Sequence, residues 1–416
     1  MPSLTGDQPC APVWPAANVP GNVLKILFVC AGGTVFGKEI ITLSLMEGLR
    51  RRGHEVSCLT STWGDHQFAA RLEEQSIAHA RLPLGFISKT MTRSSVRMTL
   101  HQLSKMPRLW LGYRRLLRRL APDAVVHSNF HHLFILWPLL TRSRTFFHVH
   151  DPFPDTGFYR RLLGFLSRRL SAFIGVSRHV RDALVGLGLP EEKVFAVLNG
   201  ITLNDARETG RGPGEPPSGA VNGVSSIVKR PRIGIVGQVA EWKGHDDFVA
   251  ALDGLRQSGQ EFSAVIFGAG AAHYLESLKQ KIARYGLAGH VRWAGFVRER
   301  ERIFTEMEIC VVPSRSADPC PTVAIEAAHY GVPLIATRRG GLPELVKDGE
   351  TGYLVDVSAP QQITDKLKAL IHDERLYGRM AAESRRYARQ HLTRERMAEE
   401  MENTLRLVLS RAGVRV

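Results

Sequence analysis

Short apolar runs alternate with amphipathic helical stretches along most of the 416-residue chain. The first run, LKILFVC at 24–30, is apolar throughout, as in a strand buried on both faces of a parallel sheet. A glycine-rich turn follows, and then a helical pattern that ends near Gly53, a typical C-terminal residue. This repetition predicts a doubly wound α/β fold. The same pattern predicts further strands at 55–60, 123–127, 145–150, 172–176 and 193–198.

One segment interrupts the alternation and divides the chain. Residues 202–231 include RETGRGPGEPPSGAVNG, which is rich in Gly, Pro and Ser and has no apolar period, as expected of a linker or loop. We therefore predict two Rossmann-like doubly wound domains, at 23–201 and 232–390, that face a cleft. A helix within 391–416 is expected to cross back to the first domain. The second domain should contain strands at 232–237, 262–267, 290–295, 309–313, 333–336 and 352–355, with helices at 361–372 and 394–409.

Composition excludes several classes of protein. Hydrophobic residues make up 44% and charged residues 23%, so the chain is not fully disordered. The longest apolar run, 133–140, is far shorter than the roughly 20 residues that span a membrane. The five cysteines have no metal-ligand spacing, which favours a reducing compartment. Residues 1–22 are proline-rich and resemble no signal peptide, so we expect a disordered tail and a cytoplasmic protein.

Positive charge is concentrated in the first half of the chain. Residues 1–200 carry 25 Lys and Arg against 13 Asp and Glu, a net charge of +12, whereas the remainder has a net charge of +3. Such an excess attracts anionic lipid, nucleic acid or an anionic substrate. No nucleic-acid recognition motif accompanies it, so nucleic acid is the least expected of these partners. The clusters are Arg93, Arg97, Lys105, Arg108, Arg114, Arg115, Arg118 and Arg119, and then Arg160, Arg161, Arg168 and Arg169.

The stretch 107–120 has a helical period with two interpretations. Its apolar residues fall on one face, and arginines surround them. The helix is either a basic surface helix packed on the sheet or a membrane-surface helix on the inner leaflet. The apolar face consists of Leu109, Tyr113, Leu116, Leu117 and Leu120.

Two acidic residues flank a predicted helix start in PSRSADPCPTVAIEAAHYGVPLIAT at 313–337. Pro321 suits the first helical position, and Asp318 and Glu326 lie eight residues apart around it. Free backbone N–H groups at Thr322 and Val323 would bind a phosphate at the positive end of the helix dipole. Glu326, one turn after Thr322, could accept hydrogen bonds from ribose hydroxyls, and Asp318 from a sugar. The arrangement predicts a sugar-nucleotide site.

Each of these residues also has a structural interpretation. Asp318 could be a loop acid and Glu326 a solvated helix residue. His148 and His150 could be core histidines, whereas His127, at a strand end, is a candidate for the acceptor site. His131 and its neighbour lack partners with ligand spacing, so we predict no metal. The GAG at 268–270 lacks the rest of a dinucleotide fingerprint.

Taken together, these motifs resemble the retaining glycosyltransferases of the glycogen-synthase-like group, group 1 and family 4 type, which have the GT-B fold. The acid-x7-acid element followed by EAAHYGVPLIAT is the central match, and the order of elements agrees from about residue 25 to 409. Each motif is short, but their common order is specific for fold and reaction class. The other matches are GQVAEWKG at 237–244, AFIGVSR at 172–178, NGI at 199–201, GGLPE at 340–344 and DGETGY at 348–353.

The resemblance implies roles for particular residues. Lys243 would clamp the donor diphosphate, Glu326 would hold the ribose, and Asp318, where the family usually has Glu, would contact the donor sugar. The first domain would bind the acceptor and the second the nucleotide sugar. His150, within HVHDPFP, would lie beside the transferred sugar. The donor-binding residues are expected to be Gly237, Gln238, Lys243, Asp318, Thr322, Val323 and Glu326, and the acceptor or phosphate would approach Gly32, Gly33 and His127.

Two positions depart from the family pattern. Gln238 stands where the family usually has Arg, which removes a positive charge from the diphosphate clamp, and Arg315 or Arg298 is a candidate to replace it. Cys320-Pro321 stands where Phe-Gly is common, and Pro321 cannot donate an N–H. These departures bear on which donor sugar is used.

The expected reaction is transfer of a hexose from a nucleotide-diphosphate donor to a glycan or lipid-linked acceptor, with retention, in cell-surface polysaccharide or glycolipid synthesis. The resemblance implies front-side displacement, in which Lys243 and the helix N-terminus stabilise the leaving diphosphate. No Asp-x-Asp element is present, so we expect neither a metal nor another cofactor. The alternatives are a sugar-nucleotide hydrolase or epimerase of the same fold and a non-catalytic basic protein that binds membranes.

Overall fold

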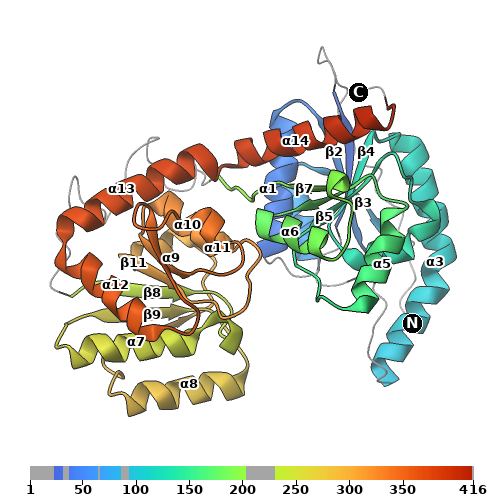
Figure 1. Ribbon diagram of the computed structural model, residues 1–416. Helices are drawn as coiled ribbons and strands as arrows, with labels where there is room; N and C mark the ends of the chain where they lie inside the picture. Colours follow the sequence, from blue (N-terminus) through green and yellow to red (C-terminus); the bar gives the residue numbers. More distant parts are fainter. Residues whose placement is uncertain (1–22, 31–36, 64–65, 86–92, 203–229, 415–416) are drawn as a thin grey trace. The chain divides into compact units, whose positions relative to one another are not determined.

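The computed structural model describes residues 23–30, 37–63, 66–85, 93–202 and 230–414, which form two α/β units (Figure 1). The first unit contains described residues up to Gly175, Ala183–Phe195 and those from Ala398 onward. The second contains Val176–Asp182 and the described residues of Ala196–Met397. The predicted tail, Gly32, Gly33 and most of the predicted linker lie outside the described residues.

The first unit has one sheet of seven strands in the order β3-β2-β1-β4-β5-β6-β7 among its described residues. Adjacent strands from β3 to β6 are parallel. The central strands are almost wholly buried, which explains their continuous apolar sequences. The strands are β1 (Lys25–Val29), β2 (Glu55–Ser61), β3 (Ala78–Leu82), β4 (Ala124–His127), β5 (Thr145–Val149), β6 (Ala172–Gly175) and β7 (Val194–Ala196).

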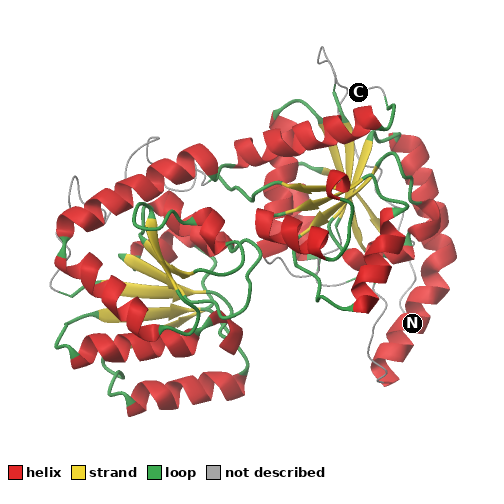
Figure 2. Ribbon diagram, in the orientation of Figure 1, coloured by secondary structure: helices red, strands yellow, loops and turns green. Residues whose placement is uncertain are grey.

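Helices lie on both faces of this sheet (Figure 2). Gly53 follows α1 with φ of 89°, as the sequence predicted for a C-terminal glycine. No helix in the described part of the chain is both long and apolar enough to span a membrane. The helices of this part of the chain are α1 (Gly37–Arg51), α2 (Gln67–Glu74), α3 (Arg93–Leu120), α4 (Phe130–Ile135), α5 (Gly157–Ser167) and α6 (Arg178–Gly186), with short 3-10 turns η1 (Trp137–Leu139) and η2 (Glu191–Lys193).

The second unit has a parallel sheet of six strands in the order β10-β9-β8-β11-β12-β13 among its described residues. Its core joins the sheet to residues such as Phe248 and Leu252 of α7 (His245–Gln257) and Leu367 of α12 (Pro360–His372). The strands are β8 (Arg232–Val236), β9 (Ser263–Phe267), β10 (Val291–Gly295), β11 (Ile309–Val312), β12 (Leu334–Thr337) and β13 (Gly352–Val355). The two parallel sheets with their flanking helices confirm the predicted pair of Rossmann-like domains.

The last helix of the chain contributes to both units. It begins in the second unit, and the residues from Ala398 onward belong to the first. There Met401, Leu405 and Leu409 are fully buried, and Glu402 accepts a hydrogen bond of 2.6 Å from Arg52 Nε. This last helix is α14 (Arg394–Arg411). The helices between β8 and α14 are η3 (Glu241–Lys243), α7 (His245–Gln257), α8 (Ala272–Arg284), α9 (Arg300–Thr305), α10 (Thr322–Tyr330), α11 (Leu342–Leu345), α12 (Pro360–His372) and α13 (Glu374–His391).

Two local expectations need correction. The helix expected from Pro107 starts at Arg93 and contains Pro107 in its interior. Of the two interpretations of its apolar face, packing on the unit is the one that burial supports, because Leu109 and Tyr113 are 0% and 1% exposed and Leu116, Leu117 and Leu120 are half-buried. Pro321 is not the first helical residue, because its ψ of 120° is extended and α10 begins one residue later.

Candidate active site

The predicted donor residues of the second unit gather where its strand order changes direction. β9 and β10 lie to one side of β8, whereas β11, β12 and β13 lie to the other. In parallel α/β sheets, ligands bind beyond the carboxyl ends of the strands at such a point. Gly237, Gln238 and Lys243 follow β8, and the loop with Asp318 follows β11, its neighbour in the sheet.

Lys243 and Asp318 form an ion pair between these two loops. Lys243 Nζ donates to Asp318 Oδ2, and the two side chains are 16% and 9% exposed. The ammonium also lies 4.4 Å from the ring centroid of Trp242, which favours a cation. Gly244, with φ of 75°, lets the loops approach, because a Cβ there would lie 1.8 Å from the carbonyl oxygen of Pro313. The sequence predicted both charged residues but not their contact.

Two glycines of the GGLPE motif support the loop that carries Asp318. Gly341 N donates to the carbonyl oxygen of Asp318 at 2.8 Å. A Cβ at Gly340, which has φ of 63°, would lie 2.2 Å from that same oxygen, and one at Gly341 would lie 2.1 Å from the carbonyl oxygen of Pro319. Ser177 Oγ donates to the Pro319 carbonyl at 2.7 Å. The backbone around Asp318 is therefore fixed by contacts that leave no space for side chains.

The start of α10 and the residue one turn later complete this cluster. No acceptor for the backbone N–H groups of Thr322 and Val323 is found within the described residues. Glu326 is buried, and its Oε1 lies 3.0 Å from Arg300 Nε of α9. Burial raises the pKa of the Glu326 carboxyl, and the charge of Arg300 opposes that rise. The cluster thus offers an ammonium, two carboxylates and the positive end of a helix dipole.

Gln238 carries no charge, so Arg298 and Arg315 were the candidates for a second cation beside Lys243. Gln238 is exposed, as is Arg298. Arg315 makes a two-pronged ion pair with Asp247, at 2.8 and 2.7 Å, which raises the pKa of its guanidinium. Arg315 is therefore engaged with a structural partner. Arg300 was not among the predicted residues, although it follows β10 at the carboxyl edge of the sheet, where the general rule places binding residues.

The first unit has an equivalent change of strand direction between β1 and β4. His127 ends β4, is fully buried, and is aligned with Val29 of β1 and Phe147 of β5. No partner for either ring nitrogen is found among the described residues, and burial lowers the pKa of His127 to about 3. His127 is therefore neutral at pH 7. Gly32 and Gly33 follow β1 but lie outside the described residues.

His150 follows β5, next to the strand that ends at His127. Its ring centroid lies 4.4 Å from that of His148. Burial lowers the pKa of His150 well below its usual value, and the charge of Lys38 adds to the effect. His148, which the sequence placed in the core, is 1% exposed. These neutral imidazoles and Lys38 lie at the carboxyl edge where the acceptor is predicted to bind.

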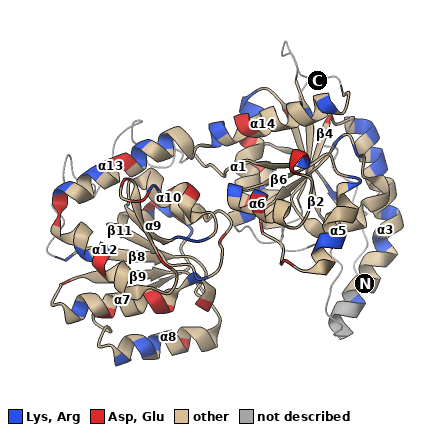
Figure 3. Cartoon of the chain, viewed as in Figure 1, with Lys and Arg blue, Asp and Glu red and all other residues tan. Residues whose placement is uncertain are grey.

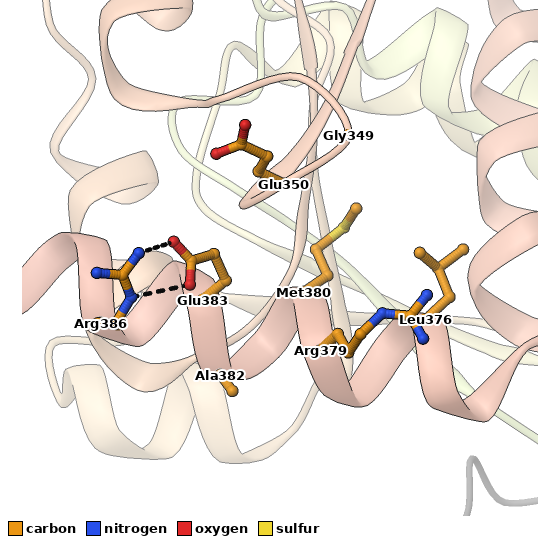
Figure 4. A pocket seen from close by; sticks show the side chains of 8 residues that line it. All are labelled: Gly349, Glu350, Leu376, Arg379, Met380, Ala382, Glu383 and Arg386. Carbon is orange, nitrogen blue, oxygen red and sulfur yellow. Dashed lines mark hydrogen bonds and ion pairs between the residues drawn. The ribbon is translucent and has the colours of Figure 1, made fainter.

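Other features of the described residues lie apart from these clusters. No group of three or more His, Cys, Asp or Glu side chains within them is arranged to hold a metal ion. A hollow formed by a turn and one side of α13 contains none of the predicted site residues (Figure 4). An ion pair between Arg386 and Glu383, with Nε and Oε2 2.9 Å apart, lines it. Its other lining residues are Gly349, Glu350, Leu376, Arg379, Met380 and Ala382.

Relatives with curated functions match part of the chain. A GDP-mannose-dependent alpha-(1-6)-phosphatidylinositol monomannoside mannosyltransferase of Mycolicibacterium smegmatis is 31% identical over 167 residues, which cover 38% of this chain and 43% of the relative. The lipopolysaccharide core biosynthesis mannosyltransferase LpcC of Rhizobium leguminosarum is 27% identical over 188 residues, 44% of this chain and 53% of the relative. The chain thus spans about half the length of the curated relatives it matches.

Solved structures share the fold over nearly the whole chain. HepE of Anabaena, in complex with UDP and glucose, superposes with a TM-score of 0.73 at 20% identity and covers 92% of this chain and 99% of its own. A glycosyltransferase of Rickettsia africae superposes with a TM-score of 0.75 at 16% identity and covers 94% and 99%. At these identities the likeness establishes the GT-B fold.

Two family models divide the chain between them. The model described as Glycosyltransferase Family 4 matches residues 37–205, and the model described as Glycosyl transferases group 1 matches residues 223–390. The two matches follow one another in the order of the two sheets. The part of the resemblance that names group 1, family 4 type glycosyltransferases is thereby confirmed, and this chain belongs to that family.

Proposed function

We propose that the protein transfers a hexose from a nucleoside-diphosphate sugar to a glycan or lipid-linked acceptor and retains the anomeric configuration. The observation that carries the proposal is the cluster at the β8–β11 switch point, where Lys243, after β8, forms an ion pair with Asp318 in the loop that precedes α10. A diphosphate is recognised by an ammonium and a helix N-terminus, and sugar hydroxyls are recognised by carboxylates. The mannosyltransferase relatives act in glycolipid or lipopolysaccharide synthesis by their names, which supports this class of acceptor.

Each charged group has a part in the proposed reaction. Lys243 and the N–H groups of Thr322 and Val323 stabilise the charge that develops on the leaving diphosphate. Asp318 orients the sugar through its hydroxyls and, as the partner of Lys243, holds the ammonium in place. Glu326 accepts hydrogen bonds from the ribose. The acceptor hydroxyl attacks the face from which the diphosphate leaves, and the departing phosphate oxygen takes its proton.

The first unit would supply the acceptor side of the reaction. His150 is uncharged at neutral pH and can therefore donate or accept hydrogen bonds without attracting a competing anion, and the fully buried His127 is uncharged as well. Lys38 provides the nearby positive charge. An acceptor with several hydroxyl groups and a phosphate fits this combination of groups.

A screen of nucleoside diphosphates followed by turnover assays tests the proposal. The correct nucleoside diphosphate at 100 times its Kd should stabilise the protein by about 2.7 kcal/mol. Lys243→Ala should reduce turnover far more than nucleoside affinity, whereas Lys279→Ala, a matched change at an exposed lysine of α8, should leave both unchanged. The anomeric coupling constant of the product, measured by NMR, reports retention. Donor cleavage that proceeds at the same rate without any acceptor would instead identify a hydrolase.

A further inference from the structure

Large apolar side chains are exposed mainly on two helices of the first unit. Among the described residues, eight large hydrophobic side chains are exposed, and five of them belong to α3 and α5. Single exposed apolar residues are common, but a gathering of them marks a surface that binds something. The five are Leu100, Leu103 and Leu111 of α3, at 60%, 45% and 52% exposure, and Phe158 and Phe165 of α5, at 62% and 45%.

One long face of α3 is buried in the unit, and the opposite face is exposed. Its inner face includes Leu109 and Tyr113 and packs into the unit. Its outer face carries Leu100, Leu103 and Leu111, and at helical spacing this row continues into Arg114 and Arg118. The outer leucines are exposed and do not pack in the core of the unit. Packing of α3 on the unit therefore does not explain why these positions are apolar.

Helix α5 repeats this arrangement on a smaller scale. Leu163 and Leu166 are fully buried, whereas Phe158 and Phe165 are exposed on the other side. The exposed residues Arg161 and Arg168 lie three residues after each phenylalanine and therefore flank the same face. Aromatic and basic side chains thus alternate along the outer face of α5.

Contacts through the segment between these helices link α3 to α5. Trp110 Nε1 of α3 donates to the carbonyl oxygen of Ile135 at 2.7 Å. Two residues later, the ring of Trp137 stacks on Phe165 with a centroid distance of 4.2 Å, and Arg169 lies over the same ring at 5.4 Å. We call the outer faces of α3 and α5 together with Trp137 the α3–α5 surface.

The α3–α5 surface has a single sign of charge. The sequence of α3 contains eight Lys and Arg and no Asp or Glu, and that of α5 contains two Arg and no acid. Figure 3 shows Lys and Arg along α3 and on α5. Arg114, Arg115, Arg118 and Arg161 are exposed and form no ion pair with any described residue. Their charge is therefore available to an anionic partner.

We propose that the α3–α5 surface docks on an anionic lipid bilayer. Arginines bind the headgroup phosphates, while the exposed Leu and Phe side chains enter the interface between headgroups and acyl chains. A second copy of the chain would present the same positive charge and be repelled. The surface is independent of the donor cluster in the second unit, so this proposal does not depend on the proposed reaction.

Vesicle sedimentation with the full chain tests this docking. The vesicles are phosphatidylcholine alone or phosphatidylcholine with about a third phosphatidylglycerol. We expect wild type to bind only the anionic vesicles at low salt and to be released near 1 M salt, where the screening length is about 3 Å. Changing Arg114, Arg115, Arg118 and Arg161 to Gln should weaken binding by about a hundredfold or more, because each basic residue near an anionic surface contributes severalfold.

A second variant separates insertion from simple charge attraction. Changing Leu100, Leu103, Leu111 and Phe158 to Ser keeps every charge and should still weaken binding by about tenfold or more, since the apolar side chains no longer leave water. The matched charge control changes Lys279, Arg284, Arg375 and Arg389, exposed basic residues of the second unit, to Gln. This control and Leu407→Ser, an exposed apolar residue of α14, should bind as wild type does. Thermal melting of every variant checks that folding is intact.

Several results would overturn the proposal. Binding of neutral and anionic vesicles alike, or no binding of either, excludes recognition of anionic lipid. A charge control that loses as much binding as the α3–α5 arginine variant shows that only net charge matters. Self-association of wild type without vesicles that the Ser variant abolishes shows that the apolar face joins two copies instead. The proposal is supported if both surface variants lose vesicle binding while they remain folded and the control variants bind as wild type does.

Discussion

Arg300 and Glu326 form an ion pair in which the guanidinium Nε lies 3.0 Å from a carboxylate oxygen of a buried side chain. Glu326 needs this neighbour because burial raises the pKa of its carboxyl. Only the ionised form accepts hydrogen bonds from both ribose hydroxyls in the proposed reaction. In the proposed reaction Arg300 would be a positioning residue for the ribose, because its charge favours the ionised form of Glu326.

Replacing this arginine should make nucleotide binding depend on pH. In Arg300→Gln the pKa of Glu326 rises further, so the carboxyl takes up a proton at a higher pH than in wild type. As the pH is lowered, the affinity for the nucleoside diphosphate should begin to fall at a higher pH than in wild type, by about tenfold or more once Glu326 is protonated, because a charged hydrogen bond contributes about 1.5–3 kcal/mol. Calorimetric titration at several pH values measures it. Arg298→Gln, at an exposed arginine two residues earlier, is the control, and parallel pH profiles for all three proteins would contradict the assignment.

Burial of His127 should make the first unit sensitive to acid. Its pKa is lowered to about 3 in the folded chain, against about 6.5 when unfolded. The unfolded state therefore binds more protons below pH 6.5, and stability that is present above that pH is lost as the pH falls toward 3. The contribution lost between pH 7 and 5 is about 2 kcal/mol.

Urea unfolding at pH 7 and pH 5 checks the histidine prediction. His127→Asn should have a smaller difference in unfolding free energy between the two pH values than wild type, by about 2 kcal/mol. His273→Asn, at an exposed histidine of α8, should show the wild-type difference. An unchanged difference in His127→Asn would mean that the imidazole does not stay neutral when folded.

The close packing of Gly340 against the Asp318 loop should make that glycine intolerant of a methyl group. In Gly340→Ala the new Cβ would lie 2.2 Å from the Asp318 carbonyl oxygen. Overpacking costs about 1–3 kcal/mol, and the left-handed backbone adds about 1–2 kcal/mol. Gly349→Ala is the matched control, since Gly349 has φ of 80° but nothing within 4 Å of its Cβ position. Thermal unfolding should show a clearly larger loss for Gly340→Ala, and equal losses would mean that the contact is easily relieved.

Chelation should leave the reaction unaffected. The sequence has no Asp-x-Asp element, and the proposed stabilisation of the diphosphate relies on Lys243 and the α10 N-terminus. We expect turnover in excess EDTA to match turnover in added Mg²⁺ within about twofold. A rate that collapses in EDTA and returns with Mg²⁺ would show that a cation replaces the arginine that is absent at position 238.

Buried strands were the most predictable part of the fold. Every strand with a continuous apolar sequence was expected within one or two residues, because burial on both faces demands such a sequence. The edge strand β3, AHARL, was missed because none of its residues is fully buried and its polar residues conceal the pattern. Helix α13 was missed for a related reason, since charged residues cover most of its surface.

Contacts between residues that are far apart along the chain could not be predicted from the sequence. Lys243 and Asp318 were each predicted as site residues. They lie 75 residues apart, and no sequence pattern predicts that they form an ion pair. The same holds for Arg315, whose expected role as a cation for phosphate is countered by its two bonds to Asp247. The exposed leucines of α3 were also missed, since a helix with apolar residues on two faces gives no single direction for its core.

The path of α14 affects how the chain can fold during synthesis. Residues from Ala398 onward bury Met401, Leu405 and Leu409 in the first unit, yet the ribosome makes them after the whole second unit. About 200 residues separate Phe195 from this final piece, which at about 5–20 residues per second is a delay of roughly 10–40 s. During that time the first unit lacks its closing helix and exposes the apolar surface that α14 later covers. The unit that is translated first is therefore finished last.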